Sequence, residues 1–158
     1  MQLIKKLRIL SVLALLVTFA IVSCKDKDDD TTPEDKNEIV GSWKLTSVAP
    51  ETAGTTIPAL AAIPTYAPCY LDLVFVFTSQ NKVTVSGCDA AITLLSVSGY
   101  ITVGSETTWK VTGDKLVLTN GSTNQELTIK QNGDQMSIII NTATSGPAVN
   151  AVLLFKRQ

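Results

Sequence analysis

Cysteine is the residue type in this sequence whose positions point most directly to chemistry. Cys24 separates an apolar segment from a charged one, and Cys69 and Cys88 lie farther along the chain. If the chain is exported to an oxidising compartment, the even number of cysteines that remain, Cys69 and Cys88, favours a disulfide. Closing a loop of about 20 residues would stabilise the fold by roughly 3 kcal/mol in the chain-entropy model. The alternatives are two free buried thiols or a metal pair, and the absence of histidine and of Cys-x-x-Cys disfavours a metal.

The remaining reactive side chains do not form a catalytic pattern. Without histidine, no Ser-His or Cys-His pair and no imidazole metal site can be built, and no glycine-rich nucleotide motif is present. Asp72 interrupts an apolar segment, but alternation places it opposite Leu73, so we expect it to be solvent-exposed rather than a buried functional carboxylate. Asp89, Asp114 and Asp134 lie in or beside turns. We therefore predict no enzymatic activity, no cofactor and no metal.

The N-terminus has the features of an export signal. Lys5, Lys6 and Arg8 precede an uncharged apolar run, residues 9–22, which is shorter than the ~20 residues of a membrane-spanning helix. The sequence Ile-Val-Ser-Cys at 21–24 resembles the bacterial lipobox. That resemblance implies a signal peptide at 1–23, cleavage before Cys24, and lipid attachment to its sulfur and new N-terminus. An ordinary signal peptide with an incidental cysteine, or an uncleaved anchor helix, is the alternative.

The segment that follows Cys24 is strongly acidic. Residues 25–38 contain seven acids and three lysines, whereas residues 39–158 contain seven of each. The composition of 24–38 predicts a flexible tether, and the neutral remainder has no basic face for nucleic acid. The lysine-and-acid run also resembles the signal that sends Bacteroidota lipoproteins to the outer face of the outer membrane. The alternative is that the run is only a solvated spacer and that the protein faces the periplasm.

Residues 39–158 show the two-residue alternation of β-strands. In 70–78, for example, Leu71, Leu73, Phe75 and Phe77 share one face. The clear strands are 41–48, 70–78, 81–87, 107–111, 115–119, 126–130, 136–140 and 150–156, with one or two more expected around 92–95 and 100–103.

Short connectors such as Asn120-Gly121 predict antiparallel neighbours. Residues 49–68 are the exception, with four prolines that exclude a long helix; we expect a long loop with at most one helical turn at 59–62, either a lid or an insertion. The pattern predicts an all-β, antiparallel, up-and-down barrel of eight to nine strands, a monomer formed by residues 39–158.

The order of these features resembles that of lipocalins and other calycins, and in particular the lipocalin-like domain of many Bacteroidota lipoproteins. The resemblance runs from residue 39 to residue 157. It is carried by Gly41, Trp43, Leu45, Cys69, Phe75, Phe77, Asn81-Lys82, Cys88, Trp109, 115–118, 132–138 and 155–157.

The resemblance also implies how one end of the barrel closes. In lipocalins the first-strand tryptophan packs across the closed end under a late basic side chain. Here Trp43 would be the ring and Arg157 the cation, with Lys156 as the other choice; a plain core tryptophan with solvated C-terminal charges is the alternative.

Two functions remain open. The first is a binding module whose apolar interior holds a small hydrophobic or amphiphilic molecule, with candidate lining residues Leu73, Phe75, Phe77, Val83, Val85, Trp109 and Val111. The second is a structural or interaction protein with a filled barrel, whose loops bind a glycan or an envelope partner. A void of roughly 300 Å³ or more would favour the first function, and a packed centre would favour the second.

Overall fold

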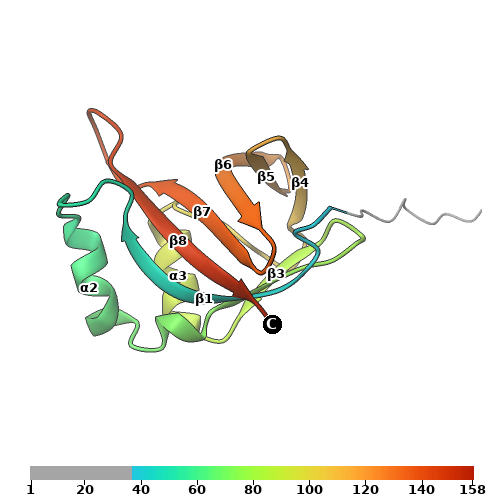
Figure 1. Ribbon diagram of the computed structural model, residues 1–158, viewed down its shortest axis with the longest axis horizontal. Helices are drawn as coiled ribbons and strands as arrows, with labels where there is room; N and C mark the ends of the chain where they lie inside the picture. Colours follow the sequence, from blue (N-terminus) through green and yellow to red (C-terminus); the bar gives the residue numbers. More distant parts are fainter. Residues whose placement is uncertain (1–36) are drawn as a thin grey trace, which may run out of the picture. The chain divides into compact units, whose positions relative to one another are not determined.

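The computed structural model describes residues 37–158, which form a nearly closed antiparallel barrel of eight strands (Figure 1). The strands follow one another around the sheet in the order β3-β2-β1-β8-β7-β6-β5-β4. Their bounds are β1 Gly41–Pro50, β2 Val74–Phe77, β3 Val83–Ser86, β4 Thr108–Thr112, β5 Lys115–Asn120, β6 Thr123–Asn132, β7 Gln135–Asn141 and β8 Asn150–Arg157. The all-β, lipocalin-like barrel predicted from the alternation is confirmed.

Several pairs of consecutive strands are joined by short turns. The hairpins β4–β5 and β6–β7 turn at Gly113 and Gly133, both with positive φ, a conformation that costs glycine little. The first and last strands also pair over nearly their whole length, from Trp43 opposite Arg157 to Pro50 opposite Ala151.

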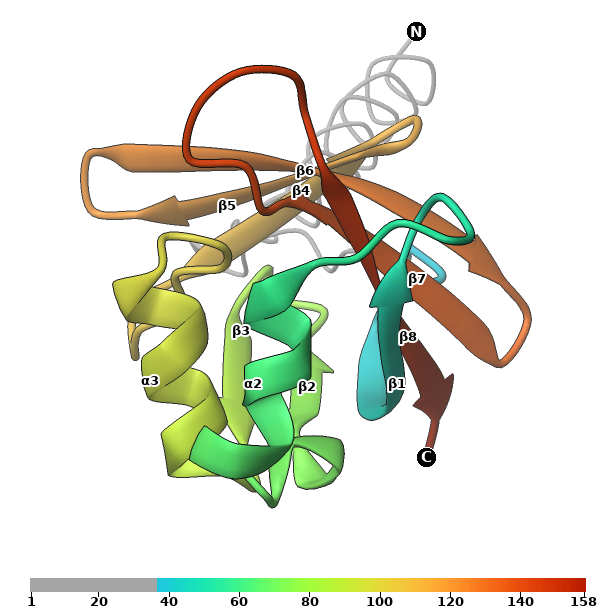
Figure 2. The same ribbon diagram turned by 90° about the vertical axis from the view of Figure 1, so that its left-hand side faces the viewer.

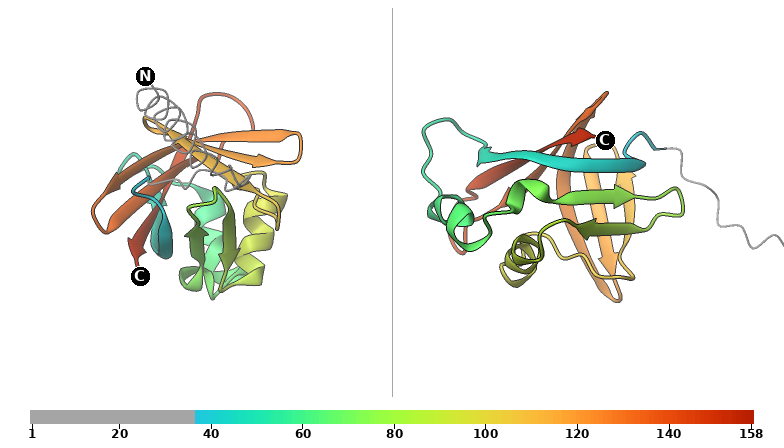
Figure 3. Two further views of the ribbon diagram at one scale, coloured as in Figure 1. Left: turned by 90° about the vertical axis from the view of Figure 1, so that its right-hand side faces the viewer. Right: turned by 90° about the horizontal axis from the view of Figure 1, so that it is seen from below.

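The seam of the barrel lies between β3 and β4. One isolated bridge joins Lys82 to Thr108. The backbone N–H of Val83 donates to the carbonyl of Thr107 at 3.1 Å, and that of Trp109 donates to the carbonyl of Asn81 at 2.8 Å. Beyond these contacts the chain leaves the sheet to form a helix, so the two strands meet near one end of the barrel and separate towards the other (Figure 3).

The proline-rich segment 49–68 contains a helix where we expected a loop. Helix α2 spans Pro58–Tyr66. Pro58 occupies the start of the helix, where its missing N–H is not needed, and Pro64 falls near the end. The prolines therefore delimit this short helix rather than exclude it, and the prediction of a single turn at 59–62 was too short.

The strands expected around 92–95 and 100–103 are wrong. Residues Asp89–Val97 form helix α3, and residues 100–103 are not in a strand. Asp89 lies in the first turn, where a carboxylate interacts favourably with the helix dipole. Gly99, with φ of 69°, follows the C-cap Ser98. Tertiary packing and these end signals outweigh the β-branched residues inside the segment.

The strand predicted at 70–78 is shorter than expected. Tyr70–Asp72 form a 3-10 turn, η1, and the strand begins at Val74. Leu71, which we predicted to share a face with Leu73, is therefore exposed, whereas Leu73 is buried. Within residues 37–158, no helix is both long and apolar enough to cross a membrane; the predicted signal peptide, Cys24 and most of the tether lie outside the described residues.

Candidate functional site

The centre of the barrel is filled by its own side chains. Phe75 and Phe155 make an edge-to-face contact with ring centroids 5.2 Å apart, and Phe77 and Trp109 make another at 5.7 Å. The buried residues that surround these rings include Trp43, Val83, Leu116, Leu118, Met136 and Ile138. This part of the interior leaves no room for a ligand.

One end of the barrel is closed by the stack expected from the family resemblance. The Arg157 guanidinium carbon lies 4.2 Å from the centroid of the Trp43 ring, within the range of a cation–π contact. Trp43 Nε1 donates to the Ile39 carbonyl at 2.7 Å, and Arg157 donates to the carbonyls of Val40, at 2.8 Å, and Glu38. These contacts fasten the segment before β1 across the end of the barrel.

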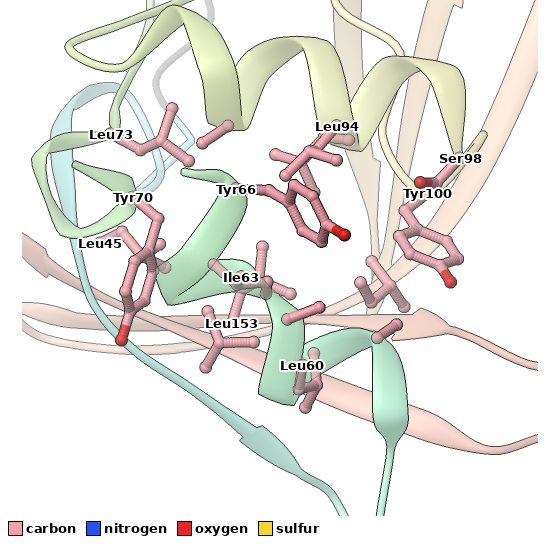
Figure 4. Close-up of a pocket in the computed structure, with 16 residues that line it drawn as sticks. Leu45, Leu60, Ile63, Tyr66, Tyr70, Leu73, Leu94, Ser98, Tyr100 and Leu153 are labelled. Carbon is pink, nitrogen blue, oxygen red and sulfur yellow. The ribbon is translucent and has the colours of Figure 1, made fainter. Parts of the chain in front are cut away.

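An apolar pocket of about 240 Å³ lies towards the other end of the barrel. Helices α2 and α3 stand side by side there (Figure 2), and the pocket is enclosed between them and the strands (Figure 4). Its lining consists of Leu45, Val48, Ala59, Leu60, Ala62, Ile63, Tyr66, Tyr70, Leu73, Ala91, Leu94, Leu95, Ser98, Tyr100, Ile140 and Leu153.

The volume sets a scale for an occupant. It is larger than the ~150 Å³ engineered cavity that binds benzene, and somewhat smaller than the roughly 300 Å³ at which drug-sized ligand sites begin. In proportion to benzene, the pocket would enclose about ten non-hydrogen atoms. Because the pocket is partly open to solvent, a longer molecule could extend out of it.

An irregularity in β1 directs the second half of this strand towards the pocket. The pairing of β1 with β8 shifts between Leu45 and Ser47, so that Thr46 is an extra residue, and its hydroxyl donates to the Leu154 carbonyl at 3.0 Å. One extra residue reverses the alternation. Val48 therefore lines the pocket on the same side of the sheet as Leu45.

The disulfide fastens the two helical walls together. Cys69 and Cys88 are bonded, as expected from their even number. Cys69 follows α2 and immediately precedes η1, whereas Cys88 is the N-cap of α3. The bond thus links the C-terminal side of one pocket helix to the start of the other. No residue of α2 is buried, so this link is an important restraint on its position.

Of the seven lining residues predicted from the sequence, the structure places Leu73 in the pocket. Phe75, Phe77, Val83 and Trp109 are buried in the packed interior of the barrel. Val85 and Val111 are half-buried at its margin. The pocket residues on α2 and α3 were missed, although Pro58 at a helix start and the Asp89–Gly99 spacing are recognisable helix signals.

Polar regions elsewhere in residues 37–158 include an exposed ion pair at Asp72 and a hollow around Gln125. Asp72 is exposed and paired with Lys44 at 3.1 Å, in line with the expectation from alternation. In residues 37–158, no three potential ligand side chains gather into a group that could hold a metal ion. A second hollow, of about 320 Å³ and formed mainly by polar residues, is lined by Gly99, Thr102, Leu118, Asn120, Thr123, Asn124 and Gln125. Gln125 lies in this hollow and hydrogen-bonds Gly99, Tyr100 and Thr102, which ties the segment after α3 to β6.

Comparison with known proteins agrees with this architecture. Residues 39–138 match the model of the lipocalin-like domain, and the chain belongs to that family. No curated protein and no solved structure gives a significant match.

Proposed function

We propose that this protein is a non-catalytic binding lipoprotein that holds a small apolar molecule in the pocket between α2, α3 and the open end of the barrel. The observation that carries the proposal is the apolar cavity of about 240 Å³, which lies apart from the packed centre of the barrel. A ligand that enters this preformed pocket removes its apolar lining from contact with water, which makes the free energy of binding favourable.

The position of the chain in the cell is part of the same proposal. Acylated Cys24 would anchor the protein in the outer membrane, and residues 24–38 would tether the barrel, facing the cell surface as in Bacteroidota lipoproteins. Several acyl chains together would make detachment rare, since one chain alone binds a bilayer only marginally. Metabolic labelling with an alkyne fatty acid should mark the chain but not its Cys24→Ala variant. Equal labelling of both chains would reject the anchor.

Binding is tested by filling the cavity. Ala62 lines the pocket, whereas its neighbour Ala61 on the same helix is exposed and does not. We expect Ala62→Phe to weaken the binding of naphthalene, a neutral probe of ten carbons, by at least ~10-fold, while the matched Ala61→Phe leaves it unchanged. An NMR titration that follows the amides of Leu60 and Ser98 measures both affinities.

The titration uses the full chain in a non-ionic fluorinated surfactant, because fluorocarbon tails compete poorly with hydrocarbon ligands. If naphthalene binds neither the unsubstituted chain nor either variant, the binding function is rejected. If both variants bind equally well, the ligand lies elsewhere.

The filled centre of the barrel favours a second candidate, an interaction protein that binds a glycan or envelope partner through its loops. The polar hollow around Gln125 offers hydroxyl and amide groups for such a partner. Saturation-transfer NMR with surface glycans would detect it.

A further inference from the structure

The pocket residues are without charge, and this feature restricts the ligand. The pocket lining contains no aspartate, glutamate, lysine or arginine. The sequence contains no lysine or arginine between Lys44 and Lys82, nor between Lys82 and Lys110. These two stretches include the whole of α2, η1 and α3. No cation from either helix can therefore neutralise an anionic ligand.

The charges that do occur in these stretches are negative. Asp72 and Glu106 are already paired with Lys44 and Lys82. Glu51 accepts a hydrogen bond from Asn150, and Asp89 lies in the first turn of α3. An anionic head group would therefore find no basic side chain on α2, η1 or α3 with which to pair.

The polar groups of the pocket are hydroxyls. Figure 4 shows the Tyr66 hydroxyl pointing towards the side of the pocket where Ser98 and Tyr100 lie. Tyr66 is 70% exposed and Ser98 is exposed, so this side is the solvent-facing one. In the part of the chain that the structure describes, no residue hydrogen-bonds to any of these three side-chain hydroxyls. They are available as both donors and acceptors for a ligand at the mouth.

From this arrangement we infer the chemical class of the ligand, an inference that rests on the proposed binding function. The pocket takes an uncharged amphiphile: an alkyl chain or ring system of about ten carbons enters between Leu60, Leu94 and Leu153. A hydroxyl on its polar end meets Tyr66, Ser98 and Tyr100. Fatty alcohols and acylglycerols belong to this class, and fatty-acid anions do not.

The physical reason is the free-energy cost of removing the head group from water. A hydroxyl that leaves water can replace its lost hydrogen bonds with those of the mouth. A carboxylate or ammonium must either shed part of its hydration or stay outside and withdraw the chain. Without a counter-charge in the lining, neither charged group recovers that cost.

Three probes with the same ten-carbon chain test the inference: 1-decanol, decanoate and decylamine at pH 7.5. Each is titrated against the full chain in the fluorinated surfactant, with Ala62→Phe as the blocked control. We expect 1-decanol to bind at least ~10-fold more tightly than either charged probe. Affinity for decanoate or decylamine equal to or greater than that for 1-decanol overturns the inference while the binding function stands. Failure of naphthalene and all three probes rejects the binding function itself.

The role of the hydroxyls has its own test. The double variant Tyr66→Phe, Ser98→Ala removes two of them at exposed positions. Loss of one net hydrogen bond corresponds to roughly 2- to 10-fold in affinity, so 1-decanol should bind that much more weakly, while naphthalene, which has no hydroxyl, binds as before. Equal losses for both ligands would show that the substitutions disturb the pocket and not a head-group contact, and would overturn this assignment.

Discussion

Reduction of the Cys69–Cys88 bond is the perturbation whose effect can be worked out most fully. The bond joins residues separated by 19 positions. In the chain-entropy model, a loop of this size stabilises the folded state by about 3 kcal/mol, because the reduced unfolded chain regains the freedom that the loop removes. For a domain of this size the same loss lowers the midpoint of thermal unfolding by roughly 10 °C.

The assay is urea unfolding of the same chain with and without a phosphine reductant, followed by tryptophan fluorescence. Both tryptophans, Trp43 and Trp109, are buried in the barrel and report on its unfolding. The control is Cys69→Ala, Cys88→Ala, whose stability should not respond to the reductant. A larger dependence of the unfolding free energy on urea is also expected after reduction, because the open chain exposes more surface.

Hydrogen exchange locates the effect. Without the bond, the amides of α2 and α3 should exchange faster, while those of β7 and β8 change much less, since the bond restrains the pocket helices. The reasoning is refuted if reduction alters the unfolding free energy by less than ~1 kcal/mol, or if Cys69 and Cys88 are alkylated in the folded, unreduced protein.

Two further predictions concern the packing of the fold, the first beside η1 and the second at the closed end of the barrel. A Cβ on Gly87, whose φ is 99°, would lie 1.9 Å from the Asp72 carbonyl oxygen, so Gly87→Ala should destabilise the fold by more than ~3 kcal/mol. Gly146→Ala, also at positive φ but in open space, should cost only about 1 kcal/mol in the same urea assay, and equal costs would contradict the packing at Gly87. Arg157→Met should lose about 1–3 kcal/mol by removing the contact with Trp43 and two hydrogen bonds to carbonyls. Arg157→Lys should recover part of that loss, and a fully stable Arg157→Met chain would show that this end closes without the stack.

The strands and their antiparallel order could be predicted from the sequence because each leaves a local signature. The pairing of Cys69 with Cys88 was predicted from their even number in a chain expected to be exported. Alternation with a period of two is visible in any strand with one buried face, as in Leu116 and Leu118 of β5. Short turns with Asn-Gly or Gly-Asp constrain consecutive strands to pair. The absence of histidine, likewise, excludes imidazole chemistry whatever the fold.

The pocket could not be predicted in this way, because it depends on which side chains meet across the sheet. Phe75, Phe77 and Trp109 have the apolar character of ligand-lining residues, but their rings pack against one another and Phe155, and fill the centre. The cavity lies instead between the helices α2 and α3 and the residues of β1, β7 and β8 that face them. Short helices with few buried residues have weak local preferences, so their formation and position depend on the barrel end and on the disulfide. Sequence alone determined the strand-forming apolar faces; tertiary packing decided which of these faces stay accessible to a ligand.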